Sequence, residues 1–228
     1  MLGIKTKFPI NLVASFDVDA QNTFTELCPL ELPVKGGQDI VGPLNKQAKF
    51  AQFRVGSKDA HSPASLWVDT DKEPQYTPIA NALNMDVRWK IHGVPGSAGF
   101  RLIDGLPAVK DYDFFVWKGI ELDMHPYGAC YHDLHGKIST GVIEWLHSKG
   151  VQLVVVGGLA LDYCVANTVF QLQKAGFAVI VNLEASRGIW ATKTEEQMVK
   201  EYNSLDNVQV IENTEDLTNY VFGNKVKA

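Results

Sequence analysis

Residues 151–174 read VQLVVVGGLALDYCVANTVFQLQK and contain both kinds of segment from which the fold is built. The run 151–157 is apolar and of strand length, whereas the stretch 164–174 places Val165, Val169 and Leu172 at helical spacing. Gly176 follows the last apolar residue, where a helix is expected to end. A buried strand that leads into an amphipathic helix is the repeating unit of parallel α/β sheets.

Segments of the same two kinds recur along the chain. Apolar runs of strand length occur at 12–19, 53–57, 112–117, 151–157, 177–183 and 208–211. A second amphipathic stretch, 139–149, has Val142, Ile143 and Leu146 on one face and stops at Gly150. This alternation predicts a Rossmann-like, three-layer α/β/α fold with a mainly parallel six-stranded sheet. The length of 228 residues suits one hydrophobic core, so we expect a single domain over residues 1–228.

The stretch 60–110 interrupts the alternation. It contains five prolines and only a weak helical signal around 79–83. A long irregular insert in a compact domain is usually a functional loop, so we expect it to form a lid or to supply part of a metal site.

Composition narrows the possible partners. The net charge is −5 and the isoelectric point is near 5.7, so the chain provides no broad basic field for nucleic acid or anionic lipid. Its apolar runs are far shorter than a membrane span, and MLGIKTKFPINL lacks the features of a signal peptide. We therefore expect a cytoplasmic protein that acts on a small molecule, with a homo-oligomer left open.

Polar side chains stand near the ends of four predicted strands, where ligands bind in open parallel sheets. They are Asp19, Asp59, Lys118 and Cys164. A cysteine at a helix start experiences unpaired N–H groups and the positive end of the helix dipole, which favour the thiolate. An acid, a cation and a thiol together predict an activated nucleophile with its base and charge partner. Each residue also has an alternative interpretation without a catalytic role. Asp19 could be a helix-capping or turn carboxylate, Lys118 a surface lysine and Cys164 a small buried packing residue.

Asp59 and His61 form a D-x-H pair, whose side chains point the same way on an extended segment. His92, from the insert, would complete a ligand set that suits Zn, Fe or Mn. A hydrogen-bonded surface pair is the alternative for Asp59 and His61. A competing cluster in the turn-rich segment 124–135 would consist of His125, His132, Asp133 and His135. Cys28 and Cys130 have no comparable partners, and we expect them to be packing residues.

Three ordered segments resemble the catalytic segments of the isochorismatase-like cysteine hydrolases, and among these the nicotinamidases. They are VDAQNTF (18–24), WKG (117–119) and GLALDYCVANT (158–168). The resemblance spans about 12–211 and implies the isochorismatase-like hydrolase fold.

The resemblance also implies roles for individual residues. Cys164 matches the nucleophile, Asp19 the general acid/base and Lys118 the lysine of the triad. The backbone N–H groups of Ala160 and Cys164 match the oxyanion hole, next to a cis peptide at Leu159-Ala160. Leu161 departs from the family, which often has threonine at this position.

The same resemblance implies one divalent metal ion, with zinc as the first expectation and iron or manganese as alternatives. The matching ligands are Asp59, His61 and His92. The matching substrate-binding aromatics are Phe24, Trp89 and Tyr127. Where some members carry a further ligand, this chain reads SPASLW, with Ser65 as the best hydroxyl. We therefore predict a three-ligand site with positions open to water and substrate.

The leading hypothesis is a nicotinamidase that forms nicotinate and ammonia through a cysteine thioester, while the metal holds the pyridine nitrogen. A related cysteine amidohydrolase, acting on another small amide, a carbamoyl or a ureido compound, would share the triad. A silent binding module or flavodoxin-like nucleotide binder is disfavoured, because VDAQNTF stands where a G-x-G-x-x-G loop would follow the first strand.

Overall fold

A six-stranded parallel sheet forms the centre of the computed structural model, which describes residues 3–225. The strand order is β4-β3-β2-β5-β6-β7, and every pairing is parallel. The strands are β2 (Val13–Val18), β3 (Phe53–Asp59), β4 (Phe114–Lys118), β5 (Leu153–Leu159), β6 (Ala178–Arg187) and β7 (Val208–Ile211). The predicted sheet is thus confirmed. A small parallel sheet, which we did not predict, pairs β1 (Phe8–Pro9) with β8 (Val221–Phe222).

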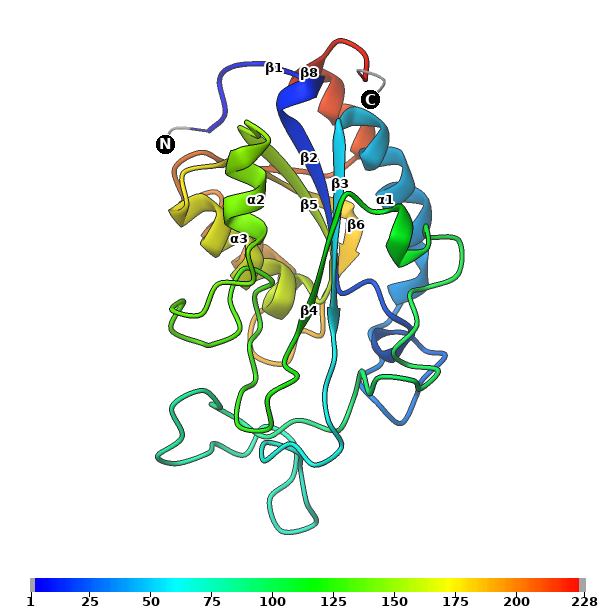
Figure 1. The fold of residues 1–228 in the computed structure, drawn as a ribbon, viewed down its shortest axis with the longest axis vertical. Helices are drawn as coiled ribbons and strands as arrows, with labels where there is room; N and C mark the ends of the chain where they lie inside the picture. Colours follow the sequence, from blue (N-terminus) through cyan, green and yellow to red (C-terminus); the bar gives the residue numbers. More distant parts are fainter. Residues whose placement is uncertain (1–2, 226–228) are drawn as a thin grey trace.

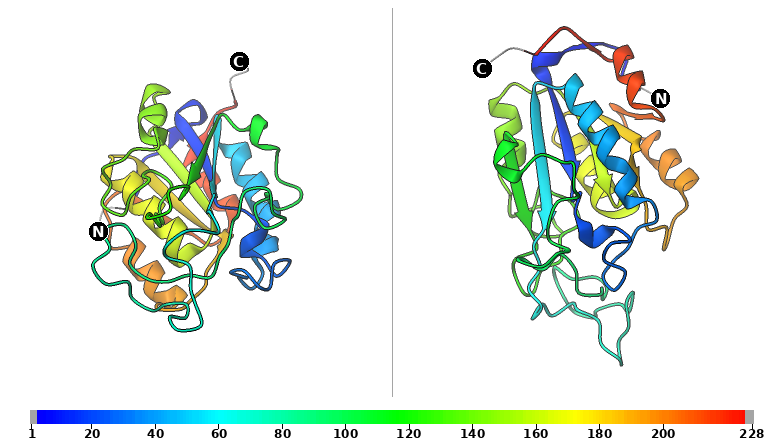
Figure 2. Two further views of the ribbon diagram at one scale, coloured as in Figure 1. Left: turned by 60° about the horizontal axis from the view of Figure 1, so that its bottom comes forward. Right: turned by 90° about the vertical axis from the view of Figure 1, so that its right-hand side faces the viewer.

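Helices cover both faces of the sheet, as Figures 1 and 2 show. On one side lies α1 (Val41–Gln47), and on the other lie α2 (Val142–Ser148) and α3 (Ala166–Lys174). Helix α4 (Glu195–Tyr202) packs on the face of α2 and α3, because its Met198 and Tyr202 belong to the same core cluster. Short 3₁₀ helices occur at Ile10–Leu12, Asn22–Phe24, Gly37–Ile40, Ala48–Phe50, Val109–Asp111 and Thr214–Asn219.

The central strands β2 and β5 are buried along their whole length. Alternate residues of β5 face opposite layers: Val154 and Val156 join the core under α2 and α3, whereas Leu153 and Val155 join a core that includes Leu217. Burial on both faces explains why these strands are nearly continuous apolar runs. No helix within residues 3–225 is both long and apolar enough to cross a membrane.

Most of the insert 60–110 lies across the carboxyl ends of the strands, at the bottom of Figure 1, and its last part runs back beside α1, where Asn45 donates to the carbonyl of Gly105. The insert contains no α-helix, so the weak helical signal at 79–83 is wrong. An antiparallel bridge pairs Pro78 with Val87, and the residues between them form a turn. A further bridge pairs Gln21 with Leu102 and ties the insert to the loop after β2.

The connection from β5 to α3 has an unusual backbone. The peptide Leu159-Ala160 is cis, as predicted, and a π-helical turn, Leu161–Val165, precedes α3. The N–H groups of Tyr163 and Val165 both donate to the carbonyl of Ala160, at 3.1 Å. Cys164 therefore lies in this turn and not at the first turn of α3.

A substitution at Gly158 on β5 tests whether the backbone of β2 and β5 must approach closely near the strand ends. Its φ is +136°, and a Cβ atom there would overlap the carbonyl of Val18 on β2. We expect Gly158→Ala to lower the free energy of unfolding by about 2–4 kcal/mol, through backbone strain and overlap. Gly42→Ala in α1, where a Cβ meets open space, should leave it unchanged or raise it by up to about 1 kcal/mol. Urea unfolding measures both, and equal effects would contradict this account.

Candidate active site

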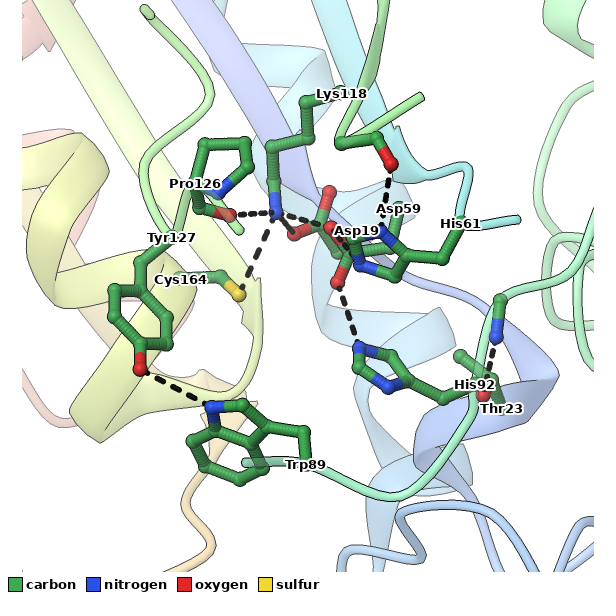
Figure 3. A network of polar contacts seen from close by, with 12 residues as sticks. Asp19, Thr23, Asp59, His61, Trp89, His92, Lys118, Pro126, Tyr127 and Cys164 are labelled. Carbon is green, nitrogen blue, oxygen red and sulfur yellow. Dashed lines mark hydrogen bonds and ion pairs between the residues drawn. The ribbon is translucent and has the colours of Figure 1, made fainter. Parts of the chain in front are cut away.

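The four polar residues predicted at strand ends meet in one buried cluster, shown in Figure 3. Asp19 follows β2, Asp59 ends β3, Lys118 ends β4 and Cys164 follows β5. The Cys164 sulfur and one carboxylate oxygen from each aspartate lie within 4.8 Å of one another. The strand ends therefore bring together the acid, the cation and the thiol.

The Lys118 ammonium lies at the centre of this cluster and is fully buried. Its Nζ is 3.0 Å from Oδ2 of Asp19 and also forms an ion pair with Asp59. It donates to the carbonyl of Pro126 at 3.2 Å and lies 3.8 Å from the Cys164 sulfur. Burial opposes the charge, but the two carboxylates outweigh it and raise the pKa of Lys118.

Asp19 has the properties of a proton carrier. The hydroxyl of Ser57 donates to its Oδ1 at 2.6 Å and accepts from its backbone N–H at 3.1 Å. Burial raises the pKa of Asp19 to about 6, against the opposing effect of Lys118. A carboxyl with that pKa can both accept and donate a proton near neutral pH.

The thiol of Cys164 differs from the expectation. Burial raises its pKa well above the ordinary value, and the charge of Lys118 offsets this only in part. The prediction that a helix start favours the thiolate is therefore wrong for the free protein, because the side chain is buried in the π-helical turn. The resting group is a thiol, and Asp19 is the adjacent base that can accept its proton.

The predicted metal ligands also lie together. A backbone carbonyl accepts from Nδ1 of each imidazole: Gly119 for His61, at 2.9 Å, and Lys90 for His92, at 2.7 Å. Each Nε2 therefore faces Asp59, at 3.3 Å and 3.6 Å from its carboxylate oxygens. Carbonyl groups that fix the outer nitrogen of inward-facing histidines are typical of metal sites. The residues present therefore fit a divalent ion.

The competing histidine cluster is not formed. Asp133 instead accepts from the N–H groups of Lys137 and Ile138, at 2.8 Å each, and His135 contacts the carbonyl of Leu83. His125 leaves that segment, and its ring lies beside those of His61 and His92. The sequence analysis considered His125 only as part of this alternative, and its position seven residues after Lys118, near a strand end, was the available signal for its true neighbours.

A small cavity opens beside these groups. The predicted aromatics Phe24, Trp89 and Tyr127 line it together with Ala160, Cys164 and His92. The hydroxyl of Tyr127 accepts from Nε1 of Trp89 at 3.1 Å and donates to Asp86 at 2.7 Å. The thiol and the histidine group therefore border one aromatic cavity.

Several residues around the site were not predicted. The carboxamide of Gln21 pairs with both the N–H and the carbonyl of Asp59, at 2.7 Å and 3.0 Å. Trp67 is fully buried, and its ring packs against His61, His92 and His125. The position of Gln21 within the segment 18–24, two residues after Asp19, was the available signal for it. Trp67 carries no sequence signal that distinguishes it from an ordinary core tryptophan.

The remaining cysteines and Ser65 lie outside the catalytic cluster. Cys130 belongs to the main core and Cys28 is half-buried, which agrees with their expected packing roles. The hydroxyl of Ser65 is buried without a hydrogen-bond partner among the described residues.

Comparisons with known proteins agree with this geometry. Residues 16–215 match the isochorismatase domain. The nicotinamidase of Saccharomyces cerevisiae is 26% identical over 212 residues, which cover 86% of this chain and 97% of that relative. The structure of a nicotinamidase and pyrazinamidase from Acinetobacter baumanii has a TM-score of 0.82 at 25% identity, over 92% of this chain and 100% of that one.

A pyrazinamidase of Pyrococcus horikoshii, solved in complex with zinc, has a TM-score of 0.69 at 23% identity and shares the fold. The structural match covers 88% of this chain and 99% of the pyrazinamidase chain. Because the domain match extends over most of the sequence, the chain belongs to the isochorismatase family.

The buried charges provide a test of the Lys118 cluster. In metal-free protein we expect Lys118→Met to lower the free energy of unfolding by about 3–5 kcal/mol, because it leaves Asp19 and Asp59 uncompensated. Adding Asp19→Asn should restore part of the loss, since one buried carboxylate is then neutral. Urea unfolding of both single variants and the double variant gives the coupling. Additive losses would show that the two side chains do not interact.

Proposed function

We propose that this protein is a nicotinamidase, an amidohydrolase that converts nicotinamide to nicotinate and ammonia. The observation that carries the proposal is that the Cys164 thiol and the Asp59–His92 group border the same aromatic cavity. A ring bound between Phe24 and Trp89 can place a carboxamide at the sulfur and its ring nitrogen toward the histidines. The nicotinamidases of Saccharomyces cerevisiae and Acinetobacter baumanii, which resemble this chain over most of its length, support the assignment.

The side chains support a two-step acyl transfer. Asp19 accepts the thiol proton of Cys164 as the sulfur attacks the carboxamide carbon, while Lys118 keeps the anionic pair compensated. The N–H groups of Ala160 and Cys164 would hold the oxyanion. Asp19 then protonates the departing ammonia, which leaves a thioester on Cys164. Water cleaves the thioester with Asp19 again as base, and the thiol is restored.

The ring end of the substrate is assigned to the aromatic and histidine groups. Phe24, Trp89 and Tyr127 would pack around the pyridine. Asp59, His61 and His92 would hold one divalent ion, which when bound supplies a Lewis-acid position for the pyridine nitrogen. We propose zinc, because imidazole and carboxylate ligands suit it and it requires no redox partner. The product nicotinate places the activity in pyridine nucleotide salvage, and we propose a cytoplasmic location.

Ammonia release tests the function directly. Cys164→Ala should lower kcat for nicotinamide by on the order of 10⁴-fold or more, because it removes the nucleophile of a coupled triad. Cys28→Ala, a thiol outside the cluster, should leave kcat unchanged. Carbamoyl and ureido compounds tested alongside should release little ammonia. Faster release from one of them than from nicotinamide would assign the triad to the related amidohydrolase class.

The pH profile tests the role of Asp19. The base form must be present to accept the thiol proton, and the pKa of Asp19 is raised to about 6. We therefore expect kcat/KM to be full above this pH and to fall as the pH decreases through about 6. Ser57→Ala removes a hydrogen bond that favours the charged carboxylate, so the acidic limb should move to higher pH. A limb that stays near pH 4, or that does not move in Ser57→Ala, would exclude Asp19 as the titrating base.

A further inference from the structure

His125 lies among the predicted metal ligands although it is distant from them in sequence. One ring nitrogen from each of His61, His92 and His125 lies within 4.8 Å of the others. The ring of His125 is stacked on that of His61, with centroids 5.2 Å apart, and lies 5.7 Å from that of His92. Its side chain is buried and borders the same cavity as Cys164.

The surroundings of His125 do not satisfy its nitrogens. Neither Nδ1 nor Nε2 has a hydrogen-bond partner among the described residues. Apolar rings surround it instead: Trp67 at 4.4 Å and Trp89 at 5.9 Å, the latter nearly parallel to it. An imidazole buried without polar partners is costly, so such groups usually have a ligand or a functional role. Aromatic walls hold the ring in place and leave its nitrogens free.

We propose that His125 is a fourth protein ligand of the metal held by Asp59, His61 and His92. The segment after β4 supplies it, whereas Asp59 and His61 come from the end of β3 and His92 comes from the insert. The presence of a metal ion rests on the proposed function, whereas the assignment of His125 as a ligand rests on the position of its ring. This replaces the expectation of three protein ligands that the D-x-H pair and the insert suggested.

A fourth protein ligand changes the chemistry of the site. With three imidazoles and one carboxylate, the protein would supply as many ligands as zinc usually takes, and few positions would be left for a substrate nitrogen. An imidazole-rich set also favours zinc or iron over manganese, which prefers carboxylate and water oxygens. His125 thereby sets the metal preference and limits the positions left to water.

Affinity for Zn²⁺ alone tests the proposal, measured by competition with a chromophoric chelator. His125→Ala should weaken binding by at least the loss typical of an outer-shell partner, on the order of 10- to 100-fold. His61→Ala and His92→Ala should weaken it at least as much. His135→Ala is the matched control, because His135 belongs to the same segment and contacts the carbonyl of Leu83 outside the cluster. It should retain wild-type affinity, as should Ser65→Ala.

Wild-type affinity in His125→Ala would overturn the proposal. Because loss of a buried ring also leaves a cavity, a second measurement uses the unmodified protein. X-ray absorption of the zinc-loaded chain should show scattering from three imidazoles, and scattering from two would exclude His125. Circular dichroism of each variant establishes that its fold is retained.

These measurements separate the inference from the function on which it builds, because none of them uses nicotinamide. A chain that loses zinc in His125→Ala but releases no ammonia from nicotinamide would keep the ligand assignment and refute the proposed reaction. A chain that releases ammonia and binds zinc equally well in His125→Ala would keep the reaction and refute the fourth ligand.

Discussion

The buried ammonium of Lys118 is the interaction on which the site depends. Two carboxylates, Asp19 and Asp59, are buried at adjacent strand ends, and like charges at that separation cannot both persist without a cation. Lys118 ends β4, the strand next to β3, and forms an ion pair with each of them. The parallel register brings the three groups together, since Asp59 and Lys118 are direct partners across the two strands. The order of strands in the sheet therefore determines which charged side chains become neighbours in the site.

The same cation makes the two aspartates different. Burial alone would raise the pKa of Asp59, but Lys118 and His61 hold it well below the usual range, so it stays an anion suited to a metal. Asp19 shares the lysine without a histidine, and its pKa stays near 6, suited to proton transfer. The thiol of Cys164, held neutral by burial, completes the division between the two roles. The different neighbours of the two carboxylates therefore suit Asp19 to proton transfer with Cys164 and Asp59 to the histidine group.

The sequence predicted the parts of this arrangement that follow from periodicity. The central strands are buried on both faces and form continuous apolar runs, whereas the edge strands are only partly buried. All six strands were found, and with them the strand-end positions of Asp19, Lys118 and Cys164. Helix α1 was missed because VGPLNKQ contains glycine and proline and buries little apolar surface. The place of His125 depends on the path of a turn-rich loop, and only its short distance in sequence from Lys118 at a strand end indicated it. The pKa of Cys164 depends on burial, which outweighs the helix start used to predict it.

The irregular insert is ordered by the site that it helps to build. A long loop without regular structure must satisfy its backbone groups through individual contacts, and several of these lie at the ligands. The backbone of His61 donates to Gly93, Gly93 in turn donates to the hydroxyl of Thr23, and Trp67 donates to the carbonyl of Met124, next to His125. These hydrogen bonds therefore help to fix both the path of the insert and the positions of His61 and His92. These contacts add to the bridges within the insert itself, which pair Val68 with Trp89 and Pro78 with Val87.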